Sequence, residues 1–194
     1  MTKYIDFYFD FISPYSYLAF KRIKSLKNKN RININYKPIL LGGLHNLSGI
    51  SAPAFNERKM KNMKNDCVLI AKKNKIDFIW NNNFPINSLY LMRGYIFIEN
   101  ETKEKFFEVC FDAYWKKNLD ISQTLNLNKI LDECNINQKK FNSGIKDQKI
   151  KDKLKKLTCD AFNLDVFGAP TFLVNKKIFW GQDRLEFALE EYNK

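Results

Sequence analysis

The chain has 194 residues, a length that fits one domain, with or without an insertion, and that allows a substantial buried core. It carries 33 basic and 21 acidic residues, a formal charge of +12. The lysines are scattered and accompany no zinc-finger or RNA-recognition pattern, so we interpret them as a solvated surface and expect no nucleic-acid partner. No apolar run approaches the roughly 18 residues of a membrane span, and we therefore expect a cytoplasmic protein without membrane association.

Four cysteines and a single histidine restrict the chemistry. Cys67, Cys110, Cys134 and Cys159 lie far apart without a Cys-x-x-Cys pair, which argues against a metal site. The first, second and fourth fall on apolar faces of predicted helices, which favours buried thiols in a reducing compartment. His45 is the only histidine, so Ser-His-Asp and Cys-His machinery is excluded unless that residue supplies the base.

The first predicted elements are a strand, a helix and a strand. Residues 3–11 are rich in aromatic and β-branched residues and predict a strand. Ser13-Pro14 predicts a turn that enters a helix. Residues 32–38 alternate strictly and predict a second strand, which ends at a proline and is followed by a loop at Gly42-Gly43. This order predicts a parallel pair of strands.

A helical period dominates from residue 55 to about residue 162. Two apolar faces follow this period: Met60, Met63, Cys67 and Ile70, and Ile150, Leu154, Leu157 and Ala161. Residues 170–180 predict a β-hairpin, and the last apolar positions predict a closing helix. An α/β thioredoxin-like fold with an all-helical insertion accounts for this order in the fewest steps, with residues 1–43 and 163–194 in the thioredoxin-like domain and residues 44–162 in the helical insertion domain.

Three distant stretches would converge in such a fold: the Ser13 turn, the hairpin entry at residues 168–171 and the turn at residues 180–184. The segments FYFDFISPYSYLAF, KPILLGGL, FPINSLYLMRG, DAYWKKNLDIS and VFGAPTFLVNKKIFWGQDRLEF occur in this order over nearly the whole chain. Together they resemble the 2-hydroxychromene-2-carboxylate isomerases, which belong to the kappa-class glutathione transferase group of the DsbA-like thioredoxin superfamily.

The resemblance implies a glutathione site. The family serine that matches Ser13 hydrogen-bonds the glutathione sulfur. The residue that matches Ala169 pairs through its backbone with the cysteinyl amide of the tripeptide, beside a cis proline at Pro170. The positions that match Gln182 and Asp183 bind the γ-glutamyl end. From the residues alone, a helix cap at Ser13, an ordinary strand-entry proline and an acid that stabilises the last helix are the alternatives.

One position departs from the family pattern. Relatives have Asn where this chain has Ile50, and Ile cannot donate the corresponding hydrogen bonds. Either the following loop, including Lys59, compensates, or glutathione binding is weaker or altered.

Four further residues are candidates for substrate contact: Tyr15, His45, Asn87 and Arg93. Packing is an alternative for Tyr15, a polar cap for Asn87 and a surface salt bridge for Arg93. Ser16 is expected to be structural, and Trp115 and Trp180 are large aromatics of the kind that more often fill cores than line sites.

The chemistry follows from two hydroxyls that stand where a redox protein has two cysteines. A helix N-terminus favours an anion, but Ser13 cannot supply a thiolate, so the anion has to come from a bound ligand. The resemblance implies that this ligand is glutathione, which is the expected cofactor. The resemblance then implies an isomerase that acts on a small unsaturated, aromatic electrophile, with Ser13 stabilising the thiolate. A kappa-like glutathione transferase and a non-catalytic thiol-binding protein are the alternatives. Relatives also suggest a homodimer.

Overall fold

The computed structural model describes residues 3–27, 32–99 and 101–194. Residues 1–2, 28–31 and 100 lie outside this description. The first two groups belong to the predicted thioredoxin-like domain and residue 100 to the predicted helical insertion. A mixed sheet has the strand order β2-β1-β3-β4 and consists of β1 (Ile5–Phe9), β2 (Ile34–Pro38), β3 (Thr171–Val174) and β4 (Lys177–Trp180). The β1–β2 pair is parallel as predicted, whereas β3 pairs antiparallel with both β1 and β4.

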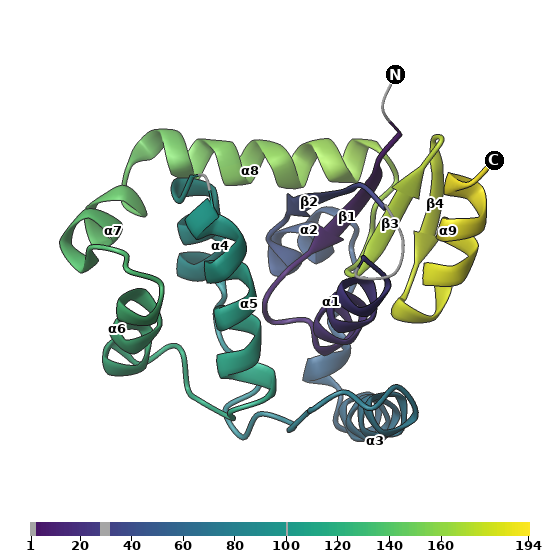
Figure 1. The fold of residues 1–194 in the computed structure, drawn as a ribbon, viewed down its shortest axis with the longest axis horizontal. Helices are drawn as coiled ribbons and strands as arrows, with labels where there is room; N and C mark the ends of the chain where they lie inside the picture. The colour runs from purple at the N-terminus through teal and green to yellow at the C-terminus, as the bar shows by residue number, and fades with distance from the viewer. Residues whose placement is uncertain (1–2, 28–31, 100) are drawn as a thin grey trace.

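Helices surround this sheet (Figure 1). α1 (Pro14–Lys27) follows β1, and the other α-helices are α2 (Leu41–Leu47), α3 (Glu57–Lys73), α4 (Leu89–Phe97), α5 (Glu101–Trp115), α6 (Thr124–Glu133), α7 (Gln138–Gly144), α8 (Gln148–Asn163) and α9 (Leu185–Tyr192). Helices α4 to α7 lie on one side of the sheet, and α8 runs from them along the sheet (Figure 1). Every strand comes from the two ends of the chain, as expected for an interrupted thioredoxin-like fold.

The loop predicted at Gly42-Gly43 is wrong, because both glycines lie inside α2. Two glycines disfavour a helix locally. The helix forms nonetheless because the buried carboxylate of Asp10 accepts a hydrogen bond from Leu41 N at 2.8 Å, and because Leu44 is fully buried. α2 also spans the predicted domain boundary after residue 43, so that boundary stays a prediction.

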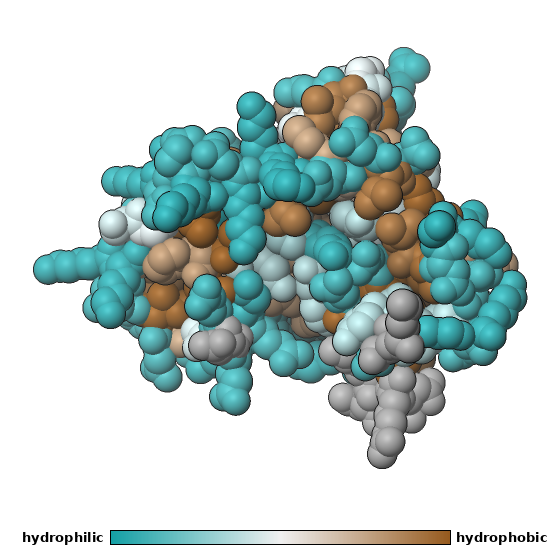
Figure 2. Space-filling model, turned by 90° about the horizontal axis from the view of Figure 1, so that it is seen from above, coloured by the Kyte–Doolittle hydropathy of each residue, from teal (hydrophilic) through white to brown (hydrophobic). Residues whose placement is uncertain are grey.

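The face that α8 crosses is mostly hydrophilic, with apolar patches between the polar side chains (Figure 2). In the part of the chain that the structure describes, no helix is long and apolar enough to cross a membrane. The same residues contain no group of three or more His, Cys, Asp or Glu side chains that could hold a metal ion. All four cysteines are free thiols, and three of them are buried.

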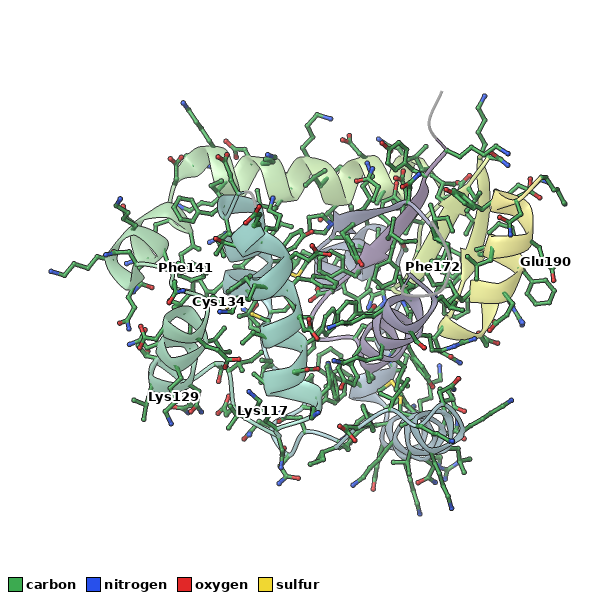
Figure 3. All side chains as sticks on the ribbon, in the orientation of Figure 1. Lys117, Lys129, Cys134, Phe141, Phe172 and Glu190 are labelled. Atoms are coloured by element: carbon green, nitrogen blue, oxygen red, sulfur yellow. The ribbon has the colours of Figure 1, made fainter. Side chains whose placement is uncertain are left out.

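The core is aromatic and extends from the sheet into the helical layer. Phe172 lies in the sheet, whereas Phe141 of α7 packs against α4 and α5 (Figure 3). Trp115 is fully buried, and its Nε1 donates to Phe11 O at 2.9 Å in the turn that follows β1. Trp180 differs from the core expectation, because it is 53% exposed and packs on Phe167. The core therefore holds the end of β1, and the turn that follows it, in place.

Candidate functional site

Ser13 lies at the N-terminus of α1 and is almost fully buried. Its Oγ accepts a hydrogen bond from Ser16 N at 3.1 Å, which is the helix-capping geometry. The same hydroxyl donates to Ala169 O at 2.9 Å. Ser13 therefore caps the helix and also joins it to a segment 156 residues away in the sequence.

The hairpin entry places a second backbone segment beside this helix end. The Ala169–Pro170 peptide bond is cis, and Pro170 O accepts a hydrogen bond from Gly181 N at 2.9 Å. Gly181 has φ +109°, a conformation that L side chains rarely adopt, and a Cβ there would lie 2.6 Å from a carboxylate oxygen of Asp183. The chain can therefore turn tightly from β4 into α9 and bring residues 182–184 next to the cis proline.

Gln182 and Asp183 differ in what they offer a ligand. Gln182 is buried, and both its side-chain oxygen and its backbone carbonyl accept from Arg22. Asp183 is exposed, and its carboxylate lies 3.4 Å from the guanidinium of its neighbour Arg184. The carboxylate of Asp183 is exposed beside Arg184 and can still accept from a cationic group of a ligand, whereas the side-chain oxygen of Gln182 is buried against Arg22.

Tyr15 completes the group. Its hydroxyl donates to Asp66 Oδ2 of α3 at 2.7 Å. Burial raises the pKa of Tyr15 strongly, and the hydrogen bond to Asp66 and the charge of Asp183 add to this effect. We call Ser13, Tyr15, Ala169, Pro170 and Asp183 the Ser13 corner. Asp66 was not predicted, and only its tertiary contact with Tyr15 identifies it.

A second acid missed at the sequence level lies beneath the Ser13 corner. Asp10 is fully buried; its carboxylate accepts from Ile12 N at 3.1 Å and from Leu41 N, and a further hydrogen bond comes from the Ser88 side chain. Its backbone carbonyl accepts from Ser13 N at 3.0 Å. Burial raises the pKa of Asp10 to about 6, although these hydrogen bonds oppose the rise. An acid three residues before Ser13, at the end of an apolar strand, was the available signal.

The structure does not join four predicted residues to the Ser13 corner by any hydrogen bond or ion pair within the described ranges: His45, Lys59, Asn87 and Arg93. His45 is half-buried on α2, and burial lowers its pKa. Asn87 Oδ1 accepts from Leu89 N at 3.0 Å, which is the polar cap considered as its alternative. Arg93 lines a separate pocket between α2, α4 and α8.

Lys59 and Ile50, the two positions linked to the family departure, lie apart from these contacts. Lys59 lies in the first turn of α3, where its backbone N donates to Asn56 Oδ1 at 3.0 Å. Ile50 is 38% exposed, and its backbone N donates to the His45 carbonyl. Compensation by Lys59 therefore stays a prediction.

The sequence of the chain is similar to those of known proteins over nearly its whole length. The model of the DSBA-like thioredoxin domain family matches residues 4–193. The 2-hydroxychromene-2-carboxylate isomerase of Sphingobium xenophagum is 29% identical over 194 residues, covering 99% of this chain and 98% of the relative. Human glutathione S-transferase kappa 1 is 24% identical, and the match covers 96% of this chain and 89% of the human protein.

The solved structures agree with these relatives. A structure of 2-hydroxychromene-2-carboxylate isomerase, in its selenomethionine form, superposes with a TM-score of 0.87 at 26% identity and covers 96% of this chain and 92% of its own. The predicted resemblance and the DsbA-like thioredoxin fold are confirmed.

Proposed function

Because the chain belongs to the DSBA-like thioredoxin domain family, we propose that it is a glutathione-dependent isomerase of the 2-hydroxychromene-2-carboxylate isomerase type. The observation that carries the proposal is the Ser13 hydroxyl at the start of α1, 2.9 Å from the Ala169 carbonyl beside the cis proline. Two relatives support the proposal, one named 2-hydroxychromene-2-carboxylate isomerase and one named glutathione S-transferase kappa 1, because each matches this chain over 89% or more of its own length. When bound, glutathione would supply a thiolate for reversible addition to an unsaturated aryl 2-oxo acid, which would turn the double bond into a single bond that can rotate, and loss of the thiolate would restore the double bond.

The residues of the Ser13 corner fit a thiol ligand that also has amide groups. In the free protein the hydroxyl hydrogen of Ser13 is directed at Ala169 O. A ligand amide that donates to the same carbonyl would release this hydrogen, and Ser13 could then donate to a sulfur anion. One hydrogen bond replaces another, so binding leaves no buried polar group unpaired.

The helix end and Ser13 can supply most of the energy for thiol ionisation. Lowering a thiol pKa from about 8.5 to ~6.5 requires roughly 2.7 kcal/mol. A hydroxyl that donates to a charged acceptor contributes about 1.5–3 kcal/mol, and a helix N-terminus contributes about 0.3–1 kcal/mol. A general base is therefore not required, which suits a chain with a single histidine.

The remaining predicted residues have proposed roles at the edge of this site. The open carboxylate of Asp183 suits the amino group of the γ-glutamyl end, and Gln182 offers its backbone and the part of its side chain not held by Arg22. Lys59 would hold a carboxylate of the tripeptide. The substrate contacts proposed are those of Tyr15, His45 and Asn87. Arg93 was predicted with them, but it lines a separate pocket, so its contact with the substrate stays a prediction.

Replacement of Ser13 by alanine tests the proposal. We expect Ser13→Ala to lower glutathione-dependent kcat/KM about 100-fold, the loss that corresponds to roughly 2.7 kcal/mol. The matched control is Ser16→Ala, because the Ser16 hydroxyl is buried and has no hydrogen-bond partner among the described residues. Full glutathione-dependent turnover in Ser13→Ala would contradict the proposed role.

The second candidate function is a kappa-like glutathione transferase, which the match to the human kappa enzyme favours. The two activities differ in what happens to glutathione, because an isomerase returns it and a transferase consumes one molecule for each product. Thiol titration after many turnovers separates them. Glutathione binding by calorimetry without turnover of any unsaturated electrophile would instead favour a thiol-binding protein, to which Ile50 would contribute.

The proposal includes the setting of the enzyme. A cytoplasmic location suits the four free thiols, and a homodimer is proposed by analogy with relatives. Sedimentation equilibrium of the purified chain tests the dimer, because a monomer at micromolar concentration would contradict it.

A further inference from the structure

A pocket of about 450 Å³ lies between α2, α4 and α8, and none of its lining residues belongs to the Ser13 corner. This volume is within the range of small-molecule sites. We call it the Arg93 pocket and define it by Leu40, Leu89, Arg93, Lys151, Leu154 and Lys155. It borders the face of the molecule that α8 crosses (Figure 2).

The charges around the Arg93 pocket are unbalanced. Arg93, Lys151 and Lys155 are cationic, and Asp152 is the one acid that lines the pocket. The Asp152 carboxylate accepts from Gln148 Nε2 at 2.9 Å rather than from any of these cations. Within the described ranges, no salt bridge or hydrogen bond involves the side chains of the three cations. The pocket therefore lacks an internal counterion.

Arg93 distinguishes this pocket from an ordinary lysine-rich surface. The two lysines reach solvent, and unpaired lysines in water are common. The Nε–H of Arg93, however, is buried and has no acceptor within the part of the chain that the structure describes. A buried donor without an acceptor is unfavourable, and an anion bound in the pocket would satisfy it if the Arg93 side chain turned its Nε–H toward the ligand. Arg also binds carboxylate and phosphate groups with a planar set of donors.

The other walls are apolar. Leu40, Leu89 and Leu154 line the pocket, together with the backbone of Gly43. Thr158 also lies there, but its hydroxyl donates to Leu154 O at 2.9 Å and accepts from Leu40 N at 3.0 Å, so it has little to offer a ligand. An apolar surface that ends in three cations selects for charge and for an apolar body at once.

We propose that the Arg93 pocket is a second ligand site, which binds a small organic anion with an apolar body and a carboxylate or phosphate group. The apolar body lies against the leucines, and the anionic group faces Arg93, Lys151 and Lys155. This site is independent of the glutathione site proposed at Ser13.

Calorimetry with three matched probes tests the site. We expect 2-naphthoate or 2-naphthyl phosphate to bind the whole chain at least tenfold more tightly than neutral 2-naphthamide, and the tighter of the two anions identifies the preferred group. The double variant Lys151→Gln/Lys155→Gln should weaken anion binding at least tenfold, and Arg93→Gln should do the same. The double variant changes only solvent-accessible side chains, so it tests the site even if Arg93→Gln fails to fold.

Lys149→Gln is the single-charge control, because it removes one lysine charge from the same helix outside the pocket. Its affinity for the anions should stay within twofold of that of the original chain. Ser13→Ala should also bind the anions normally. The proposal is overturned if the amide binds as tightly as the anions, if Lys149→Gln and the double variant behave alike, or if Ser13→Ala abolishes binding.

Discussion

The Ser13 corner and the Arg93 pocket treat their polar groups in opposite ways. In the Ser13 corner, the hydroxyls of Ser13 and Tyr15 each donate to a protein acceptor. In the Arg93 pocket, three cations surround an apolar wall without a partner among the described residues. The buried carboxyl of Asp10 contacts both regions, because it accepts hydrogen bonds from Ile12 N in the turn before α1 and from Leu41 N at the start of α2.

This difference determines what each site requires of a ligand. A ligand of the Ser13 corner must exchange hydrogen bonds one for one, so the geometry of its amide and thiol groups decides binding. A ligand of the Arg93 pocket only has to bring negative charge and apolar surface, so a broader set of molecules can fit. The first arrangement suits catalysis, because a hydroxyl held in place loses little freedom when the anion arrives.

The largest expected effect concerns Asp10, on which both sites depend. Its pKa is about 6 in the folded chain against an ordinary value near 3.8, so the folded state binds a proton that the unfolded state has lost in this range. The contribution of Asp10 to stability therefore falls as pH rises, by roughly 2 kcal/mol between pH ~4 and pH ~6 and by roughly 3 kcal/mol over the whole titration. Urea unfolding of the original chain and of Asp10→Asn at several pH values measures this.

The difference in unfolding free energy between the original chain and Asp10→Asn, followed against pH, isolates the ionisation of Asp10. Asp10→Asn places an amide N–H₂ near backbone donors and is expected to be less stable at low pH. Its disadvantage should shrink as pH rises, because only the original chain has the buried acid to ionise. A stability difference that stays constant from pH ~4 to pH ~7 would show that Asp10 is already ionised below this range.

The second prediction tests whether the Ser13 corner favours an anion. In a Cys159→Ser background, Ser13→Cys should introduce a thiol with a pKa near ~7, about 2 kcal/mol below an ordinary thiol in ionisation free energy. Burial raises the pKa of Cys67, Cys110 and Cys134, so these thiols stay protonated over that range. Ultraviolet thiolate absorbance against pH gives the value, and a pKa above ~8.5 would remove the basis for thiolate stabilisation.

Elements with a strong local pattern could be predicted from the sequence. The parallel β1–β2 pair, the closing hairpin and the apolar face of α8 with Leu154 and Ala161 follow from periodicity. α2 could not be predicted, because it depends on a hydrogen bond from the backbone N of Leu41 to the carboxylate of Asp10. Asp10 lies 31 residues earlier in the chain. A local pattern contains no information about such a contact.

The same limit applies to the site. The motifs around Ser13, Ala169 and Asp183 indicated which segments would meet, because they recur together in the family. They did not indicate that Ser13 would already donate to Ala169 O, since that bond depends on a side-chain rotamer. The partner of Tyr15 lies on α3, 51 residues away, and no motif connects the two.

A smaller effect is expected when the Ser13 hydroxyl is removed. Ser13→Ala loses the cap bond from Ser16 N and the bond to Ala169 O, so unfolding free energy should fall by about 1–2 kcal/mol. Ser16→Ala should be neutral or slightly stabilising, because the Ser16 hydroxyl is buried without a partner in the described part of the chain. Equal losses in the two variants, measured by urea unfolding, would mean that the Ser13 bonds contribute nothing specific.

The smallest effect should have the opposite sign. Lys151→Gln/Lys155→Gln removes two cations that lack acidic partners in the described ranges, so relief of repulsion should leave stability unchanged or raise it by up to ~0.5 kcal/mol. Urea unfolding at low and at raised salt measures this, and the gain should fade with salt because screening weakens the repulsion. Lys149→Gln provides the matched single-charge control.

The sign of the stability change in the double lysine variant distinguishes the Arg93 pocket from the Ser13 corner better than its size does. A polar group that has a partner stabilises the fold, so its removal is unfavourable, as expected at Ser13. A cation held near other cations without a partner does not stabilise the fold, so its removal is not unfavourable, and ligand binding is the role proposed here for the three cations together. If the double lysine variant loses more than ~1 kcal/mol, the lysines stabilise the fold itself, and the contrast between the two sites disappears.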